Sequence, residues 1–140
     1  MKAYAIAYLV AAPTFFLIDA VWLYLASERL YRKHIGHLLA DSFSLMPAIP
    51  FYLIYALGIV VFAVVPALKA GSWSNASLSG ACLGLVAYAT YDLTNQATLR
   101  SWPVVVTLLD CTWGTFLTSI VATFAYYVVS RTIGSSGITP

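Results

Sequence analysis

The sequence predicts an all-α integral membrane protein, built as a four-helix transmembrane bundle with short connections. Of its 140 residues, 61% are hydrophobic and only 9% are charged, and the mean hydropathy is +0.86. A soluble domain carries about 25% charged residues, so this composition indicates a chain immersed in lipid. At ~20 residues per span, the length allows about four spans and no separate soluble domain. We therefore expect a single transmembrane domain over 1–140.

Four apolar stretches are long enough to cross a bilayer, and they lie at about 3–26, 47–68, 76–97 and 102–129. The first is too long for a cleaved signal peptide and lacks a small-residue exit site, so we expect it to be retained. Prolines punctuate both ends of the second. The 27–46 connection is compatible with a short interfacial helix. Residues 130–140 are small and polar, which is typical of a mobile tail.

Three aspartates interrupt these otherwise apolar spans, namely Asp19, Asp92 and Asp110. An ionised carboxylate at the centre of a bilayer helix costs ~2.5–3.5 kcal/mol, so such residues usually face a bundle interior, a partner or water. Four spans put both termini on one side of the membrane. The helix directions then place all three aspartates towards the opposite face. The sequence therefore predicts an acidic site near one membrane face.

Aromatic and polar residues share helix faces with these aspartates. Asp19 and Asp110 each begin a D-x-x-W pattern, and residues of the third span recur at helical spacing. Arg100 is near enough in sequence to neutralise part of the charge. The candidates for ligand binding or proton coupling are Asp19, Trp22, Tyr88, Tyr91, Asp92, Asn95, Arg100, Asp110 and Trp113.

A structural role for the same residues stays open. Tryptophan and tyrosine are enriched at membrane interfaces, where they anchor helices without binding anything. Asp92 lies close to a helix end beside Asn95, where its side chain can have a structural role such as capping the helix. Asp19 and Asp110 lie deeper, where ionisable groups are more often functional. We therefore favour a functional role for these two and leave Asp92 undecided.

A stripe of small residues predicts how two of the helices pack. Gly80 and Gly84 have the small-x-x-x-small spacing that lets helix backbones approach closely. Gly114 and Thr118 offer a matching surface on the fourth span. Packing within the chain is favoured over dimerisation, and it would bring Asp92 towards the start of the fourth span.

No catalytic residue can be assigned, and no cofactor is expected. The spans contain neither the histidine that would ligate a haem nor the lysine that would hold a retinal. Nucleophile elbows, P-loops and dinucleotide fingerprints are also missing from the sequence. His34 and His37 form a weak metal-ligand pair, more typical of a basic face that meets lipid headgroups. We predict no metal site.

Several strings taken together resemble a known family. They include LIDAVWL, PFYLIYALGIVVFAVVPAL, AYATYDLTNQATLRSWP and WPVVVTLLDCTWG, within roughly residues 3–125. They are similar to a bacterial family of membrane proteins catalogued as domain of unknown function 2177. The resemblance implies a four-helix integral membrane protein and supplies no catalytic assignment. Its signature positions here are Asp19, Trp22, Tyr91, Asp92, Asn95, Trp102, Pro103, Asp110 and Trp113.

Two classes of function fit these features, and a third possibility is a purely structural role. The leading hypothesis is binding or transport of a small cation, a proton or a cationic amphiphile in the acidic and aromatic pocket. Four helices are few for a transport pathway, so transport would predict a homodimer. The runner-up is a small membrane enzyme acting on a lipid or isoprenoid. The third is an accessory subunit of a larger membrane complex, in which the aspartates only secure the fold.

The same features predict the partners and the cellular location of the protein. The bilayer is the first partner, and a small molecule or a lipid is the expected ligand. A net charge of +2 with scattered cations excludes nucleic acid, which requires a basic face. The resemblance implies a multi-pass protein of the bacterial inner membrane.

Overall fold

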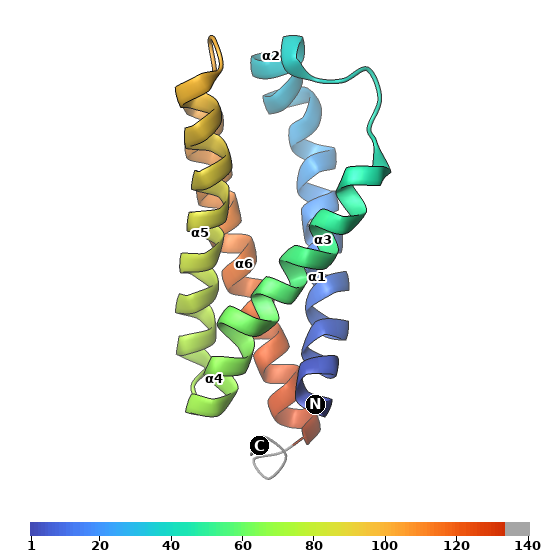
Figure 1. Cartoon of the computed structure of the whole chain (residues 1–140), viewed down its shortest axis with the longest axis vertical. Helices are drawn as coiled ribbons and strands as arrows, with labels where there is room; N and C mark the ends of the chain where they lie inside the picture. The colour runs from blue at the N-terminus through green and yellow to red at the C-terminus, as the bar shows by residue number, and fades with distance from the viewer. Residues whose placement is uncertain (134–140) are drawn as a thin grey trace.

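Four long helical segments lie alongside one another in the computed structural model, which describes residues 1–133 (Figure 1). The first consists of α1 (Lys2–Ala26), a π-helical turn η1 (Ser27–Tyr31), α2 (Arg32–Ile35) and a 3-10 turn η2 (Gly36–Leu38). The second consists of α3 (Leu45–Ile59), a π-helical turn η3 (Val60–Val64) and α4 (Val65–Ala70). The third and fourth are α5 (Trp73–Thr98) and α6 (Val104–Ile133). The described residues contain no strand, and the predicted all-α bundle is confirmed.

Two helices continue beyond the predicted spans. Most of the expected 27–46 connection is helical, and the first segment ends only at Leu38. Arg32 and Glu28 form an i,i+4 ion pair of 2.7 Å on the exposed side of this extension. Residues 130–133, assigned to the tail, form the last turn of α6. The rest of the expected tail, 134–140, lies outside the described residues.

The turn between the second and third segments explains why the chain reverses there. Gly71 follows α4 with a left-handed φ of 63°, a conformation that favours glycine and commonly ends a helix. Ser72 then caps α5 by accepting a hydrogen bond from the Asn75 amide at 3.4 Å. α5 therefore runs back antiparallel to α4.

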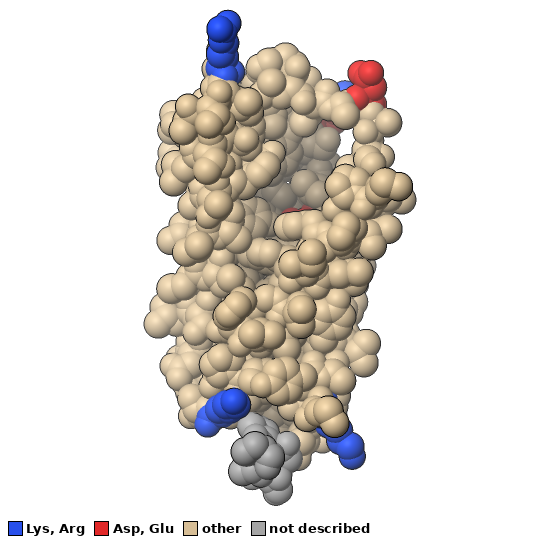
Figure 2. Space-filling view, viewed as in Figure 1, with Lys and Arg blue, Asp and Glu red and all other residues tan. Residues whose placement is uncertain are grey.

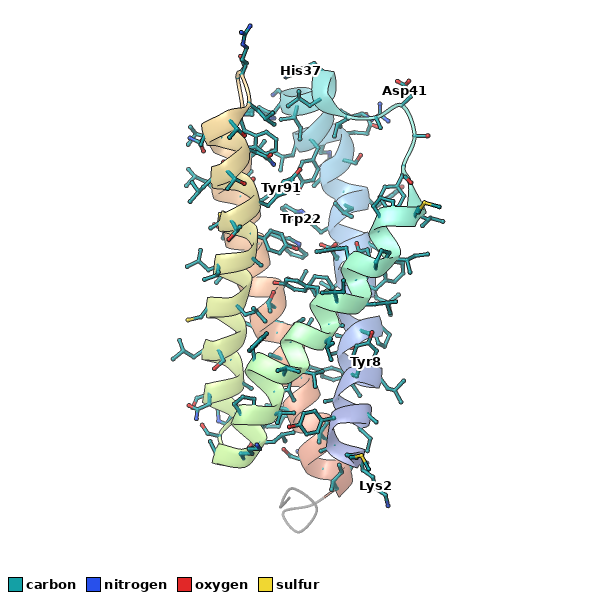
Figure 3. The ribbon with its side chains drawn as sticks, in the orientation of Figure 1. Lys2, Tyr8, Trp22, His37, Asp41 and Tyr91 are labelled. Carbon is teal, nitrogen blue, oxygen red and sulfur yellow. The ribbon has the colours of Figure 1, made fainter. Side chains whose placement is uncertain are left out.

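Three of the four segments in the described part of the chain are long and apolar enough to cross a membrane: Lys2–Leu38, Leu45–Ala70 and Val104–Ile133. α5 is equally long but richer in serine, threonine and asparagine. It lies antiparallel to α6 along most of its length, so the two helices occupy the same depth (Figure 1). Lys2 marks one end of the bundle, and His37 and Asp41 mark the other (Figure 3).

Two apolar clusters lie at the two ends of the bundle. The larger one, near the termini, joins all four segments and contains Phe15, Ile59 and Leu117, each fully buried. The smaller one joins the end of the first segment to the start of α6, through residues such as Leu30 and Trp102. The three aspartates lie between the two clusters. Apolar packing on both sides thus places the polar groups at one level of the bundle.

Candidate ligand-binding site

The two D-x-x-W patterns interlock across α1 and α6. The Trp113 indole N–H donates to Asp19 Oδ1 at 3.1 Å. In the other direction, the Trp22 indole donates to the Tyr31 hydroxyl at 3.1 Å, and that hydroxyl donates to Asp110 Oδ1 at 2.6 Å. The two indoles stack with centroids 4.4 Å apart and an interplanar angle of 12°. Each tryptophan is therefore linked by hydrogen bonds to the aspartate of the opposite helix: Trp113 directly to Asp19, and Trp22 through Tyr31 to Asp110.

Asp19 has its hydrogen-bonding capacity largely occupied. Besides the Trp113 indole on Oδ1, it accepts a 2.7 Å hydrogen bond from the Tyr52 hydroxyl on Oδ2. The side chain is only 6% exposed. These bonds join α1 to α3 and to α6, so Asp19 acts as a polar anchor of the bundle. Tyr52 was not among the predicted site residues, because it lies on a helix distant in sequence from Asp19.

Tyr31 is a central residue of the site that helical spacing could not identify. It follows Trp22 by nine residues, and at 3.6 residues per turn it would lie about 180° away around the helix. The π-helical turn Ser27–Tyr31 accommodates an extra residue and turns the following side chains back by about 100°. Tyr31 thereby reaches both Trp22 and Asp110. π-Turns are frequent at functional sites, but the sequence carries no clear signal for one.

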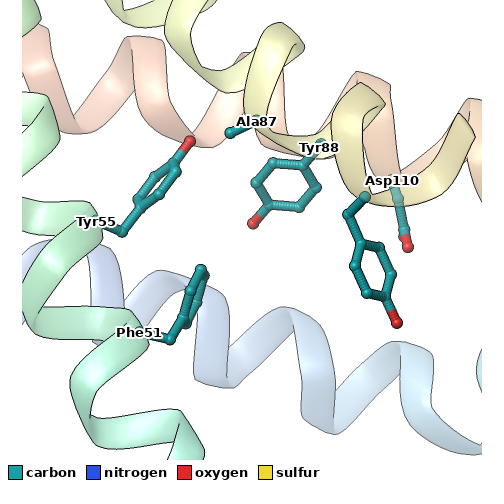
Figure 4. A pocket seen from close by; sticks show the side chains of 6 residues that line it. Phe51, Tyr55, Ala87, Tyr88 and Asp110 are labelled. Carbon is teal, nitrogen blue, oxygen red and sulfur yellow. The ribbon is translucent and has the colours of Figure 1, made fainter. Parts of the chain in front are cut away.

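Asp110 lines a pocket to which α3, α5 and α6 contribute side chains. This pocket has a volume of ≈ 340 Å³, within the ~300–1,000 Å³ common for small-molecule sites. Figure 2 shows a hollow on this face of the bundle, with atoms of acidic residues visible inside it. Asp110 is only 7% exposed, and within the described chain its Oδ2 accepts no side-chain hydrogen bond. The lining residues are Phe51, Tyr55, Ala87, Tyr88, Tyr91 and Asp110 (Figure 4).

Aromatic rings from α3 and α5 form the walls of this pocket. The rings of Phe51 and Tyr55 lie 5.6 Å apart, and Tyr55 meets Tyr88 edge to face at 6.5 Å. The Tyr55 hydroxyl is bonded to Thr118 Oγ1 at 2.9 Å, which holds its ring in place. Tyr88 packs directly over Gly114, where any added Cβ would overlap its ring. The walls are therefore fixed by packing across three helices.

Asp92 is enclosed rather than open to the pocket. Its side chain is 0% exposed, and neither carboxylate oxygen has a hydrogen-bond partner in the described structure. It faces the α5–α6 interface, where the glycines bring the two helices together. An ionised carboxylate without a partner is strongly unfavourable in such surroundings. Asp92 is therefore a buried carboxyl group without a hydrogen-bond partner at a close helix–helix interface.

The remaining candidates lie at the end of α5. Tyr91 lines the pocket and meets the Trp102 ring edge to face at 5.9 Å. Asn95 is half-buried one turn further along. Arg100 is exposed in the α5–α6 turn, and within residues 1–133 it makes no ion pair with a carboxylate. The structure therefore does not bring Arg100 to the acidic site.

A hydrogen-bonded network that starts at Trp102, one of the signature positions, joins α5 and α6 at the same end. The Trp102 indole donates to Thr107 Oγ1 at 3.1 Å, and that hydroxyl donates to Gln96 Oε1 at 2.9 Å. Trp102 also belongs to the smaller apolar cluster. This network holds the start of α6 against the end of α5, which sets the position of Asp110.

The histidines and carboxylates do not converge. Within the described residues, no group of three histidine, cysteine, aspartate or glutamate side chains is arranged to hold a metal ion. His34 instead contacts the Leu30 carbonyl oxygen through Nδ1 at 2.8 Å.

The fold and the site together define a class, that of all-helical membrane proteins with carboxylates held among aromatic rings inside the bundle. The chain belongs to the family described as predicted membrane protein (DUF2177), whose model matches residues 4–127. This confirms the family resemblance seen in the sequence. No curated protein and no solved structure gives a significant match.

Proposed function

We propose that this protein binds a small organic cation at Asp110 and passes it within or across the membrane. The observation that carries the proposal is a carboxylate with one oxygen free, at the wall of a pocket otherwise lined by aromatic rings and one alanine. Cations are attracted to the faces of aromatic rings by ~0.5–2 kcal/mol, more when water is excluded. In agreement with the family resemblance, we place the protein in the bacterial inner membrane.

The charge balance of the site also supports a cationic ligand. The Asp110 carboxylate lines the pocket, and no lysine or arginine does. The one ion pair within the described residues, between Arg32 and Glu28, lies on the exposed outer side of the first segment. An incoming cation would supply the charge that the protein itself does not provide.

Binding of tetramethylammonium to the protein in lipid nanodiscs tests this proposal. We expect Asp110→Asn to weaken binding by at least about tenfold, equivalent to ~1.4 kcal/mol, because the amide removes the charge. The amide oxygen can still accept the Tyr31 hydrogen bond, so the fold should survive. Asp41→Asn, at an exposed aspartate between η2 and α3, is the matched control and should bind like the wild type.

The other outcomes separate the competing functions. Equal binding by wild type and Asp110→Asn would contradict a carboxylate-dependent site. Product formed from an added lipid or isoprenoid by the purified protein would support the membrane enzyme instead. A protein chain that co-purifies in fixed proportion, with no cation binding, would support an accessory subunit.

A further inference from the structure

A second, apolar pocket continues the first one along the groove between α3 and α5. It has a volume of ≈ 360 Å³ and shares Phe51, Tyr55 and Ala87 with the pocket at Asp110. Its remaining lining residues carry no charge and no hydrogen-bonding side chain: Ile54, Gly58, Phe62 and Leu83. The two pockets therefore form one groove, with a carboxylate near one end only.

This groove lies on the lipid-facing surface of the bundle. Ile54 and Phe62, on its α3 side, are 69% and 65% exposed. Such exposure of large apolar side chains is expected where a helix meets acyl chains. A molecule already dissolved in the bilayer could thus enter sideways, without first leaving the membrane.

We propose that the ligand is a single-chain amphiphile with a cationic head, lying lengthwise in this groove. The head would contact Asp110 and the rings of Tyr88 and Tyr91, and the chain would run past Gly58 to Phe62. This inference rests on the proposed function and adds the chemical class of the ligand. It is carried by the charge complementarity of one end and the wholly apolar lining of the other.

The same lining disfavours ordinary phospholipids. A zwitterionic or anionic headgroup carries a phosphate, which needs an arginine, a lysine or several amide donors. The residues lining the pocket provide no basic side chain, and the Asp110 carboxylate would repel the phosphate. An amphiphile whose head carries only positive charge, such as an amine or a quaternary ammonium group, fits the groove. Its head matches the end at Asp110, and its chain matches the apolar end.

Gly58 allows the chain-binding part of the groove to be blocked without touching the acidic end. A Cβ built there would meet only the Phe62 ring, at 4.0 Å, so a larger side chain has room to extend into the groove. Leucine is also a better helix former than glycine. Gly58→Leu should therefore fold normally. Leu78→Trp, at an exposed position on α5 that lines neither pocket, serves as the control.

The experiment uses two probes on full-length protein in nanodiscs. One is tetramethylammonium, and the other is a long-chain alkyl trimethylammonium carrying a diazirine near the chain end, applied at a fixed mole fraction in the lipid. We expect the diazirine to label residues 54–62 of the second segment, in α3 and η3, and the facing part of α5. Gly58→Leu should reduce this labelling at least about tenfold and leave tetramethylammonium binding unchanged. Leu78→Trp should change neither.

Each alternative result has a distinct meaning. Tetramethylammonium binding that depends on Asp110, with labelling that is spread over all helices or insensitive to Gly58→Leu, would overturn the groove and leave the cation site intact. Failure of wild type to bind either probe would overturn both proposals. Equal labelling by an alkyl sulfate of the same chain length would show that the groove holds chains without selecting a positive head.

Discussion

At the level of single residues, the three intramembrane aspartates occupy three different environments. Both oxygens of Asp19 accept hydrogen bonds, one oxygen of Asp110 is paired and the other is left for the pocket, and neither oxygen of Asp92 has a partner within the described chain. A buried polar group costs little when it is bonded and much when it is not. The three residues therefore contribute differently to stability, although the sequence presents them alike.

This difference predicts that Asp19→Asn destabilises the fold more than Asp92→Asn does. Asp19→Asn replaces a two-oxygen acceptor by an amide with one, which leaves the Tyr52 hydroxyl or the Trp113 indole without its acceptor. We expect a loss of ~1–3 kcal/mol, the usual cost of a buried unpaired donor. Asp92→Asn breaks no hydrogen bond and should change stability by less than about 1 kcal/mol.

Thermal unfolding in detergent, followed by the near-ultraviolet circular dichroism of the tryptophans, measures both variants under one condition. A larger loss for Asp92→Asn than for Asp19→Asn would contradict the assignment of Asp19 as the anchor.

At the level of the elements, glycines set the distance between α5 and α6. A Cβ added at Gly84 would overlap the backbone oxygen of Gly114, and one added at Gly80 would lie 2.8 Å from the Thr118 oxygen. Backbone atoms cannot turn aside as a side chain can, so the two helices would have to separate. The predicted close packing of the third and fourth spans is therefore confirmed, with Gly84 and Gly114 at its tightest point.

The effect of a glycine-to-alanine substitution on stability should depend on where the glycine lies, and not on the loss of glycine itself. We expect Gly84→Ala to destabilise the fold by ~1–3 kcal/mol, as overpacking of a close interface commonly does. Gly58→Ala, the same change in another apolar helix, meets only Phe62 at 4.0 Å and should be neutral or slightly stabilising. Denaturation in mixed micelles compares the two. Equal destabilisation by the two variants would contradict the α5–α6 contact as its cause, because only Gly84 lies at that contact.

At the level of the whole molecule, the arrangement of the four segments predicts the membrane topology. Both ends of the described chain lie at the same end of the bundle, together with the α4–α5 turn (Figure 1). The 39–44 connection and the α5–α6 turn lie at the other end. Because α5 runs beside α6, we predict that it crosses the bilayer with α6, although its sequence is less apolar than that of the other three segments.

Labelling of single cysteines with a membrane-impermeant maleimide tests this topology. In a background without Cys82 and Cys111, cysteines at Ser42 and Arg100 should react from one side of the membrane. A cysteine at Gly71 should react only from the other. If Gly71 and Arg100 react from the same side, α5 does not span the membrane and the packing of α5 on α6 is incorrect.

The sequence by itself determined the helical membrane class, the four long helices and the family. These features depend on hydropathy and on the period of 3.6 residues, both of which are local properties of the chain. The same period gives the wrong position for one residue of the site, Tyr31. It separates Tyr31 from Trp22 by half a turn, and only the π-helical turn Ser27–Tyr31 brings them together.

Only the tertiary structure decided what each carboxyl group does. The donors to Asp19 and Asp110 come from helices distant along the chain, and a charge near in sequence, Arg100, stays outside the site. The apolar groove likewise exists only because α3 and α5 face each other beside Asp110. Burial, pairing and cavity shape depend on which surfaces meet. A pattern along one helix specifies its face but not the partner opposite it.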